Sequence, residues 1–220
     1  MKKATALLVS SFLLLSACGN QEKGITQSDI DELDKKEEKQ NEKIHDPLKF
    51  AKADKNEIFV SDEGMGEFKI LKKYTNSNSD ENGITSVSNN GFDFNFSYML
   101  IQDVSTEEKY LAYFGEIVNN TDKKLEFLNK VKFVTDTGEQ LTPEFGIGTG
   151  ALNEDLSSGS KTKGFHKVKL DYDDEIPKQI GVTIDKVDDN ENMEHFGDVQ
   201  KLQLSTDGKP KEDVALPIEM

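Results

Sequence analysis

The chain has 220 residues, with 27 basic and 42 acidic side chains and a formal charge of −15 at neutral pH. A surface of this sign repels phosphate polymers and anionic lipid headgroups, so nucleic acid is excluded as an expected partner. This length predicts one folded domain with accessory segments, or two small domains. A single cysteine means that no internal disulfide can form.

Residues 1–17 have the parts of a secretory signal peptide. Lys2 and Lys3 give it a positive start, and the apolar run 4–15 is too short to span a bilayer as a helix. Small residues then lead to Cys18, the one cysteine of the chain. We therefore expect the chain to be exported.

The tetrapeptide Leu15-Ser16-Ala17-Cys18 resembles the lipobox of bacterial lipoproteins. In that family the cysteine sulfur receives a diacylglycerol, and a dedicated peptidase cuts before it. The resemblance implies a lipid anchor on Cys18, palmitate-type acyl chains, and a location on the extracytoplasmic face of the cell membrane. Two acyl chains hold a protein stably, whereas one binds only marginally. The alternative is an ordinary cleaved signal peptide with a chance cysteine.

A charged tether is expected over residues 18–56. This stretch is rich in Lys, Asp and Glu, and its scattered apolar residues Ile30, Leu33 and Ile44 are too sparse for a buried helical face. His45 has no partner histidine nearby, so we expect it to be solvated.

From residue 57 to 206 the pattern changes to the period of two that is typical of β-strands. The clearest case is "FDFNFSYML" (92–100), where large apolar residues alternate with polar ones. Asn-Asn-Gly at 89–91 predicts a hairpin with "ITSVS" (84–88). "KYLAYFGEIV" (109–118) is apolar on both faces, as a central strand would be.

Further strands are predicted along the rest of this body, and no long stretch has the spacing of an amphipathic helix. About seven to nine short strands separated by Gly, Asn and Asp turns predict a mostly β fold, a sandwich or a barrel. Residues 207–220 read as a frayed C-terminal tail. The other expected strands are "EIFVS", "EFKILKKY", "LEFLNKVKFVTDTGEQL", "FHKVKLDY", "QIGVTIDKV" and "KLQLS".

The segment "YFGEIVNNTDKKLEFLNKVKFVTDTGEQLTP" (113–143) resembles the immunoglobulin-like domain of uncharacterised lipoproteins, mostly of Gram-positive bacteria. Similar elements follow in "LSSGSKTKGFHKVKL" and "IPKQIGVTI", so the resemblance covers about residues 92–187. It implies an immunoglobulin-like antiparallel β-sandwich outside the membrane. It implies no catalytic residues, because the family has no agreed activity, and it leaves open the place of residues 57–88.

Two short motifs are excluded as catalytic or nucleotide sites. Ser158-x-x-Lys161 has the spacing of penicillin-recognising serine enzymes, but Gly159 intervenes and the companion motifs S-D-N and K-T-G are absent. We interpret it as a polar turn. The run "GIGTGA" (146–151) lacks the G-x-G-x-x-G spacing of a dinucleotide site and is interpreted as a loop.

The acids after the later strands are a weak candidate for a Ca²⁺ site, because hard cations take six to eight oxygen ligands. The calcium-loop consensus fails, since counting from Asp188 places Met193 where it requires glycine. Zinc is not expected from three dispersed histidines, and we expect His166 to be hydrogen-bonded beside the core. The candidate acids are Asp171, Asp173, Asp174, Asp185, Asp188 and Asp189.

These features predict a membrane-anchored lipoprotein that binds a protein or an envelope component without catalysis. The predicted partners are the membrane, through diacylglyceryl-modified Cys18, and an envelope or membrane protein. One alternative is an extracytoplasmic sensor of a small ligand or Ca²⁺ through the acidic loops. Another is a hydrolase acting on the envelope. Apart from Ca²⁺, no cofactor is expected.

Overall fold

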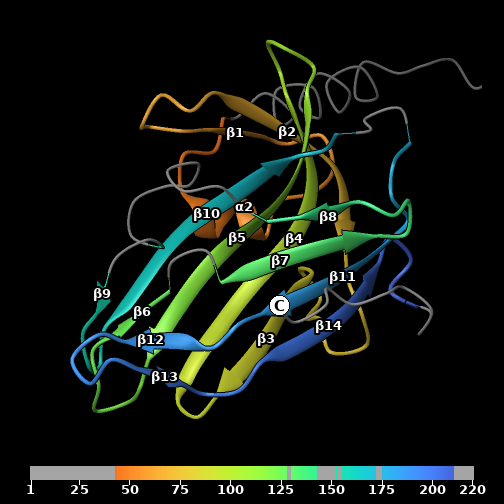
Figure 1. Cartoon of the computed structure of the whole chain (residues 1–220). Coiled ribbons are helices and arrows are strands. Elements are labelled where there is room, and N and C mark those ends of the chain that lie inside the picture. Colours follow the sequence, from red (N-terminus) through yellow and green to blue (C-terminus); the bar gives the residue numbers. More distant parts are fainter. Residues whose placement is uncertain (1–42, 128–129, 143–151, 153–154, 172–174, 211–220) are drawn as a thin grey trace, which may run out of the picture. The chain divides into compact units, whose positions relative to one another are not determined.

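The computed structural model describes residues 43–127, 130–142, 152, 155–171 and 175–210. They belong to one compact unit and form an antiparallel β-sandwich (Figure 1). This confirms the predicted mostly β, antiparallel fold. The described residues contain a single helix, α2 (Pro47–Ala51). No helix among them has the length and apolar character needed to cross a membrane.

The largest sheet of the described residues has six strands and runs in the order β1-β2-β4-β5-β10. The strand β3 pairs with β4 on the side that β2 also uses, so β4 meets β3 over 92–97 and β2 over 98–103. The six strands are β1 (Ile58–Val60), β2 (Glu67–Tyr74), β3 (Ile84–Asn89), β4 (Phe92–Asp103), β5 (Lys109–Asn119) and β10 (Lys161–Lys169).

The predicted hairpin and the predicted central strand are both confirmed. β3 and β4 pair antiparallel around Asn90 and Gly91, whose φ angles of 54° and 90° suit a tight hairpin turn. β5 lies between β4 and β10, and most of its side chains are buried on both faces. The residues 57–88, which the sequence left unplaced, supply β1, β2 and β3.

Two smaller sheets cover one face of the large sheet, in the orders β14-β11-β7-β8 and β13-β12-β6-β9 within the described part of the chain (Figure 1). Side chains of all three sheets share one core, in which Phe94, Phe133 and Val182 are buried. The strands are β6 (Leu125–Glu126), β7 (Val131–Thr135), β8 (Gln140–Leu141), β9 (Asp155–Leu156), β11 (Gln179–Ile184), β12 (Val187–Asp189), β13 (Glu194–Phe196) and β14 (Gln200–Ser205).

The other face of the large sheet is covered by α2 and the chain around it, which corrects the predicted boundary of the tether at residue 56. Ile44, Phe50 and Phe59 are buried, and the ring centroids of Phe50 and Phe114 are 4.8 Å apart. These residues and the sheet face beneath them form a second hydrophobic core. A few apolar residues in this segment are enough to complete it, because the sheet supplies most of its side chains. The folded body therefore begins by residue 43.

A short sequence signal for α2 explains why the helix forms there. Asp46 is the N-cap, and its carboxylate accepts hydrogen bonds from the backbone N–H groups of Leu48 (2.8 Å) and Lys49 (3.2 Å). Pro47 occupies the first helical position, where its missing N–H costs nothing. The Asp-Pro pair thus marks the start of a packed element.

The "NNTDK" turn after β5 is organised by the side chain of Asn119, which is fully buried. Its amide donates to the carbonyls of Lys123 (2.8 Å) and Leu156 (2.9 Å). Its oxygen accepts from the Thr121 backbone N–H (3.0 Å) and hydroxyl (2.6 Å). One side chain therefore connects the end of β5 and the turn that follows it to Leu156, which is 37 residues further along the chain.

Candidate functional site

Three of the acids predicted as calcium ligands form salt bridges with lysines. A lysine ammonium competes with a metal ion for the same oxygens. Among the described residues, there is no group of three or more His, Cys, Asp or Glu side chains that could hold a metal ion. Asp173 and Asp174 lie outside the described residues. The pairs are Asp185 with Lys132 (2.7 Å), Asp188 with Lys130 (2.6 Å) and Asp189 with Lys123 (2.5 Å).

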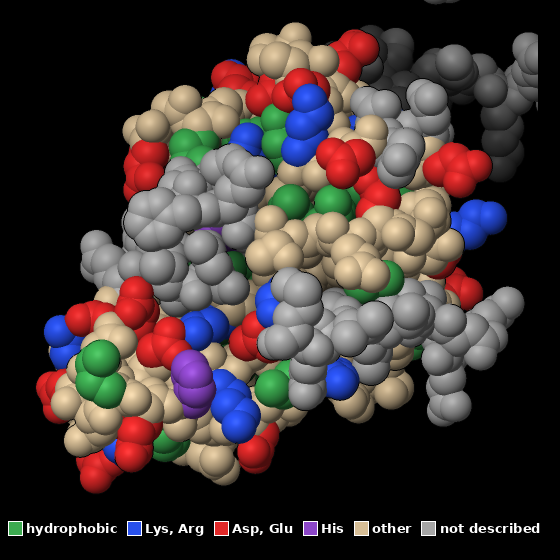
Figure 2. Space-filling model, viewed as in Figure 1, with side chains coloured by type: hydrophobic (Ala, Val, Ile, Leu, Met, Phe, Trp, Pro, Cys, Tyr) green, Lys and Arg blue, Asp and Glu red, His purple; other side chains and the backbone are tan. Residues whose placement is uncertain are grey.

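The pair of Lys123 and Asp189 is the most enclosed of the three. Asp189 is buried, and hydrogen bonds from Lys123 and from Asn192 hold its pKa to about 2. On the face of the molecule drawn in Figure 2, acidic and basic side chains are interspersed and the acids do not form one continuous patch. The described part of these loops is thus an ion-pair network around β12.

The three histidines lie in different environments. His45 is exposed, as predicted, but it lies in the body rather than in a tether, with its Nδ1 2.6 Å from an Asp62 oxygen. His195 Nδ1 lies 2.8 Å from Asp188. His166 is 1 % exposed, and neither of its ring nitrogens has a hydrogen-bond partner among the described residues. The predicted hydrogen bond of His166 is therefore wrong.

His166 ends a row of polar aromatic side chains inside the sandwich. Strand register places Tyr74 beside Tyr98, Tyr98 beside Tyr113, and Tyr113 beside His166. The Tyr74 hydroxyl donates to the Pro177 carbonyl (2.9 Å). Tyr98 Oη has no partner among the described residues. Burial raises the pKa of the tyrosines and lowers that of His166 to about 4.

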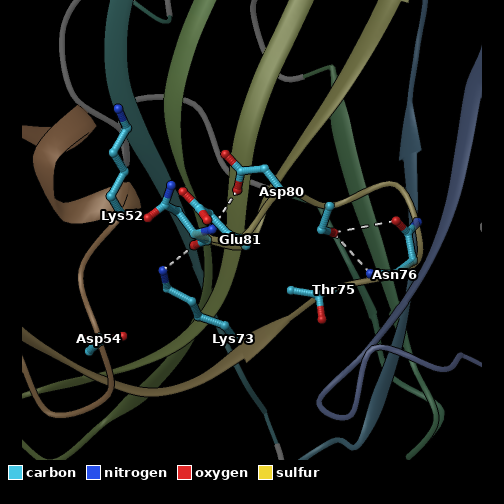
Figure 3. Close-up of a pocket in the computed structure, with 10 residues that line it drawn as sticks. Lys52, Asp54, Lys73, Thr75, Asn76, Asp80 and Glu81 are labelled. Carbon is cyan, nitrogen blue, oxygen red and sulfur yellow. Dashed lines mark hydrogen bonds between the residues drawn. The ribbon is translucent and has the colours of Figure 1, made fainter.

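A polar pocket of about 390 Å³ opens where the chain after α2 meets the connection between β2 and β3 (Figure 3). Asp80 shapes this connection by accepting hydrogen bonds from the backbone N–H groups of Asn82 (2.9 Å) and Ile84 (2.8 Å). The lining residues are Lys52, Asp54, Lys73, Thr75, Asn76, Ser79, Asp80, Glu81, Asn82 and Gly83.

Lys73 joins the two walls of the polar pocket. Its ammonium donates to the carbonyls of Ala51 (3.0 Å) and Asn82 (2.8 Å). Burial lowers its pKa, while the carboxylates of Asp54 and Asp80 act in the opposite direction. With carboxylates, hydroxyls and ammonium groups around it, the pocket can exchange hydrogen bonds with a polar ligand or with polar side chains of a partner.

A second hollow, the β8–β10 cleft, has a volume of about 520 Å³. One wall comes from the large sheet and the chain just after β10, and the other from β8. It combines apolar walls with charged and amide groups, the usual composition of a ligand site. The lining residues are Tyr110, Gln140, Leu141, Thr142, Lys167, Val168, Lys169 and Asp171.

Neither hollow was predicted from the sequence. The two short motifs were interpreted as turns or loops, and for one of them the structure agrees: Ser158 donates to the Thr121 carbonyl (2.7 Å). The residues 146–151 lie outside the described part. So do Cys18 and the lipobox residues Leu15, Ser16 and Ala17.

Comparisons with known proteins add little about function. No family model matches the chain, and no curated protein matches it. A similar solved structure is that of a functionally unknown protein from Listeria monocytogenes EGD-e. The two chains share 12% sequence identity. The match covers 64% of this chain and 88% of the Listeria chain, with a TM-score of 0.40.

Proposed function

We propose that the chain is an exported lipoprotein, held on the outer face of the cell membrane through acylated Cys18, whose β-sandwich is a non-catalytic binding module. The observation that carries the proposal is the sequence Leu15-Ser16-Ala17-Cys18 directly after an apolar run. No second cysteine is present to suggest a disulfide or redox role.

The early start of the folded body supports a short-range role. Because the body begins by residue 43, the proposed tether runs from residue 19 to residue 42. These roughly 24 residues reach ~85 Å when fully extended and ~25–30 Å as a flexible coil. A module on such a tether would meet partners close to the membrane.

The polar pocket is the surface that we propose for the partner. Its walls carry both acidic and basic side chains, including Glu81 and Lys52, which are exposed. Mixed charges of this kind favour a protein or an envelope component with complementary polar groups. The described part of the acidic loops supports no cation-sensing role, because Asp185, Asp188 and Asp189 each pair with a lysine.

The anchor is tested by feeding cells an alkyne fatty acid and fractionating them. The unsubstituted chain is expected to carry the label and to sediment with membranes, whereas Cys18→Ser loses both because the acceptor sulfur is gone. Label-free chain in the soluble fraction, or Cys18→Ser behaving like the unsubstituted chain, would refute the anchor.

The binding role is tested with a photo-crosslinking amino acid placed at Glu81 in the anchored chain, in living cells. A product specific to this position is expected. The matched control is the same amino acid at Glu191, an exposed acid on the connection between β12 and β13. Identical products at both positions, or none at Glu81, would argue against the polar pocket as the contact surface.

A further inference from the structure

The polar pocket has two walls that come from different parts of the chain. One wall is made by Lys52 and Asp54, which follow α2, and we call residues 43–54 the N-terminal segment. The other wall is made by residues 75–83, the connection between β2 and β3. The strands hold this second wall at both of its ends, whereas the first wall depends on the packing of the N-terminal segment against the large sheet. The pocket is therefore complete only while that segment is docked on the sheet.

The contacts that dock the N-terminal segment lie outside the pocket. Phe50 is fully buried in the second core. Asp46 caps α2 and also contacts Lys163 on β10. Just after the segment, the backbone N–H of Asn56 donates to the Ile70 carbonyl (3.0 Å) and fixes the chain to β2. Release of the segment up to this point would remove one wall of the pocket and leave the strands that hold the other wall in place.

Lys73 on β2 connects the two walls. Its ammonium donates to the carbonyls of Ala51 (3.0 Å) in the N-terminal segment and of Asn82 (2.8 Å) in the second wall (Figure 3). Burial lowers the pKa of Lys73, and the carboxylates of Asp54 and Asp80, one from each wall, act in the opposite direction. When the segment leaves, water reaches the ammonium and competes for its hydrogen bond to Asn82, so the second wall is held less firmly.

We infer that Lys73 couples the docking of the N-terminal segment to the polar pocket, so that docking and binding at the pocket stabilise each other. A partner that touches both walls binds the docked state alone, and its apparent affinity is proportional to the docked fraction. This effect on binding rests on the proposed role of the pocket as the partner surface, whereas the coupling of the two walls is a property of the chain alone. In the anchored chain that we propose, the tether joins the segment at residue 43, so a pull on the tether acts on the docking first.

The coupling of the walls is tested without a partner, by amide hydrogen exchange followed by NMR. The sample is the chain from residue 19 onward, which retains every described residue. The amide of Ala53 reports on the N-terminal segment and that of Gly83 on the second wall, because each donates a 3.0 Å hydrogen bond within its own wall. Asp46→Ala removes the cap of α2, and the loss of an N-cap typically shifts an opening equilibrium about fivefold. We expect Ala53 to exchange about fivefold faster and Gly83 at least about twofold faster.

Three comparisons separate the coupling from a general loss of stability. Asp46→Asn keeps a capping side chain and should leave both amides within about twofold of the unsubstituted chain. Lys73→Met removes the ammonium, and in that background Asp46→Ala should accelerate Ala53 alone. Lys72→Met removes the same charge from the neighbouring exposed position and should leave the response of Gly83 intact. An unchanged Gly83 in Asp46→Ala, or the same acceleration of Gly83 with and without Lys73, would overturn the inference.

A measurement on the unsubstituted chain covers the case in which a variant does not fold. Amides that one opening exposes share the same dependence of exchange on low urea concentrations. Ala53 and Gly83 should follow one slope, shallower than that of Val182, whose strand β11 is paired on both sides. Different slopes for Ala53 and Gly83 would refute the coupling. A single slope for all three amides would also refute it, because the opening would then be global unfolding.

The effect on binding is tested in living cells with the photo-crosslinking amino acid at Glu81. Phe50→Ala removes a buried ring and should undock the segment, whereas Phe50→Leu keeps most of the packing. The product at Glu81 should fall in proportion to the docked fraction that the exchange of Ala53 gives for each variant. An undiminished product from a mostly undocked chain would overturn the effect on binding. No product at Glu81 even in the unsubstituted chain would refute the partner surface and this effect with it, whereas the exchange experiments decide the coupling of the walls on their own.

Discussion

The buried imidazole of His166 should make the stability of the fold fall between pH 7 and pH 5. Burial lowers its pKa to about 4 in the folded chain, whereas an unfolded histidine has a pKa of about 6.5. The unfolded chain therefore binds the proton first as the pH falls, and stability decreases with acidification. The effect begins near pH 6.5 and is complete below pH 4.

The two pKa values set the size of the effect. Linkage gives a loss of about 2 kcal/mol in the free energy of unfolding between pH 7 and pH 5, and about 3 kcal/mol at still lower pH. Protonation of the carboxylates whose pKa is lowered, such as those of Asp103 and Asp189, also destabilises the fold. Their window lies at and below about pH 4, so the interval from pH 7 to pH 5 isolates the histidine.

Urea unfolding followed by circular dichroism at pH 7, 6 and 5 measures this loss, and His166→Phe removes its cause. Phenylalanine can keep the stacking on Tyr113, whose ring centroid is 5.8 Å from that of His166. It also removes two ring nitrogens that lack partners among the described residues. We expect the variant to be at least as stable at pH 7 and to lose about 2 kcal/mol less by pH 5.

The matched control is His195→Asn, which removes an exposed histidine beside Asp188. Its pH dependence between pH 7 and pH 5 should not show the 2 kcal/mol change expected for His166→Phe. If the unsubstituted chain and His166→Phe lose the same stability over this interval, the reasoning about the buried imidazole is wrong.

Three substitutions and two truncations test the packing further by urea or thermal unfolding. Gly115→Ala should destabilise by about 3 kcal/mol or more, because its Cβ would lie 1.9 Å from the Asn95 carbonyl oxygen. Gly138→Ala, with open space at a φ of 95°, should cost only about 1 kcal/mol, and equal costs would contradict this. Asn119→Ala should cost about 3 kcal/mol, whereas full stability would show that its hydrogen bonds matter little. A chain starting at residue 43 should unfold like the longer one, but a start at residue 57 should lower Tm by about 10 °C or abolish folding.

The strands could be predicted from the sequence because their signals are local. The alternation in 92–100 and the Asn-Gly turn before it specify one hairpin, and the large apolar residues of that pattern share one core. The opposite face is less regular, because Ser97 and Met99 are buried there as well. A central strand such as β5 is recognisable for the same reason, since its residues are apolar on both faces.

The second core could not be predicted in this way. Six of the fourteen residues 43–56 are charged, and the buried side chains Ile44, Phe50, Ala51 and Ala53 follow no regular period. Their burial depends on a sheet face made by strands far along the chain. The same holds for the β8–β10 cleft, because its walls are about 30 residues apart in sequence and only the sheet topology brings them together.

The buried lysine of β10, Lys167, and the second core are coupled through the large sheet. Phe68, whose ring faces the Lys167 ammonium, belongs to the core that residues 43–60 complete. Phe59 also contacts Phe165, two positions before Lys167 on β10, with ring centroids 4.9 Å apart. If the chain is anchored as we propose, the segment next to the tether packs directly against the strand that carries the lysine. Losing that segment would expose the ammonium to water, and the stability of the second core should fall with it.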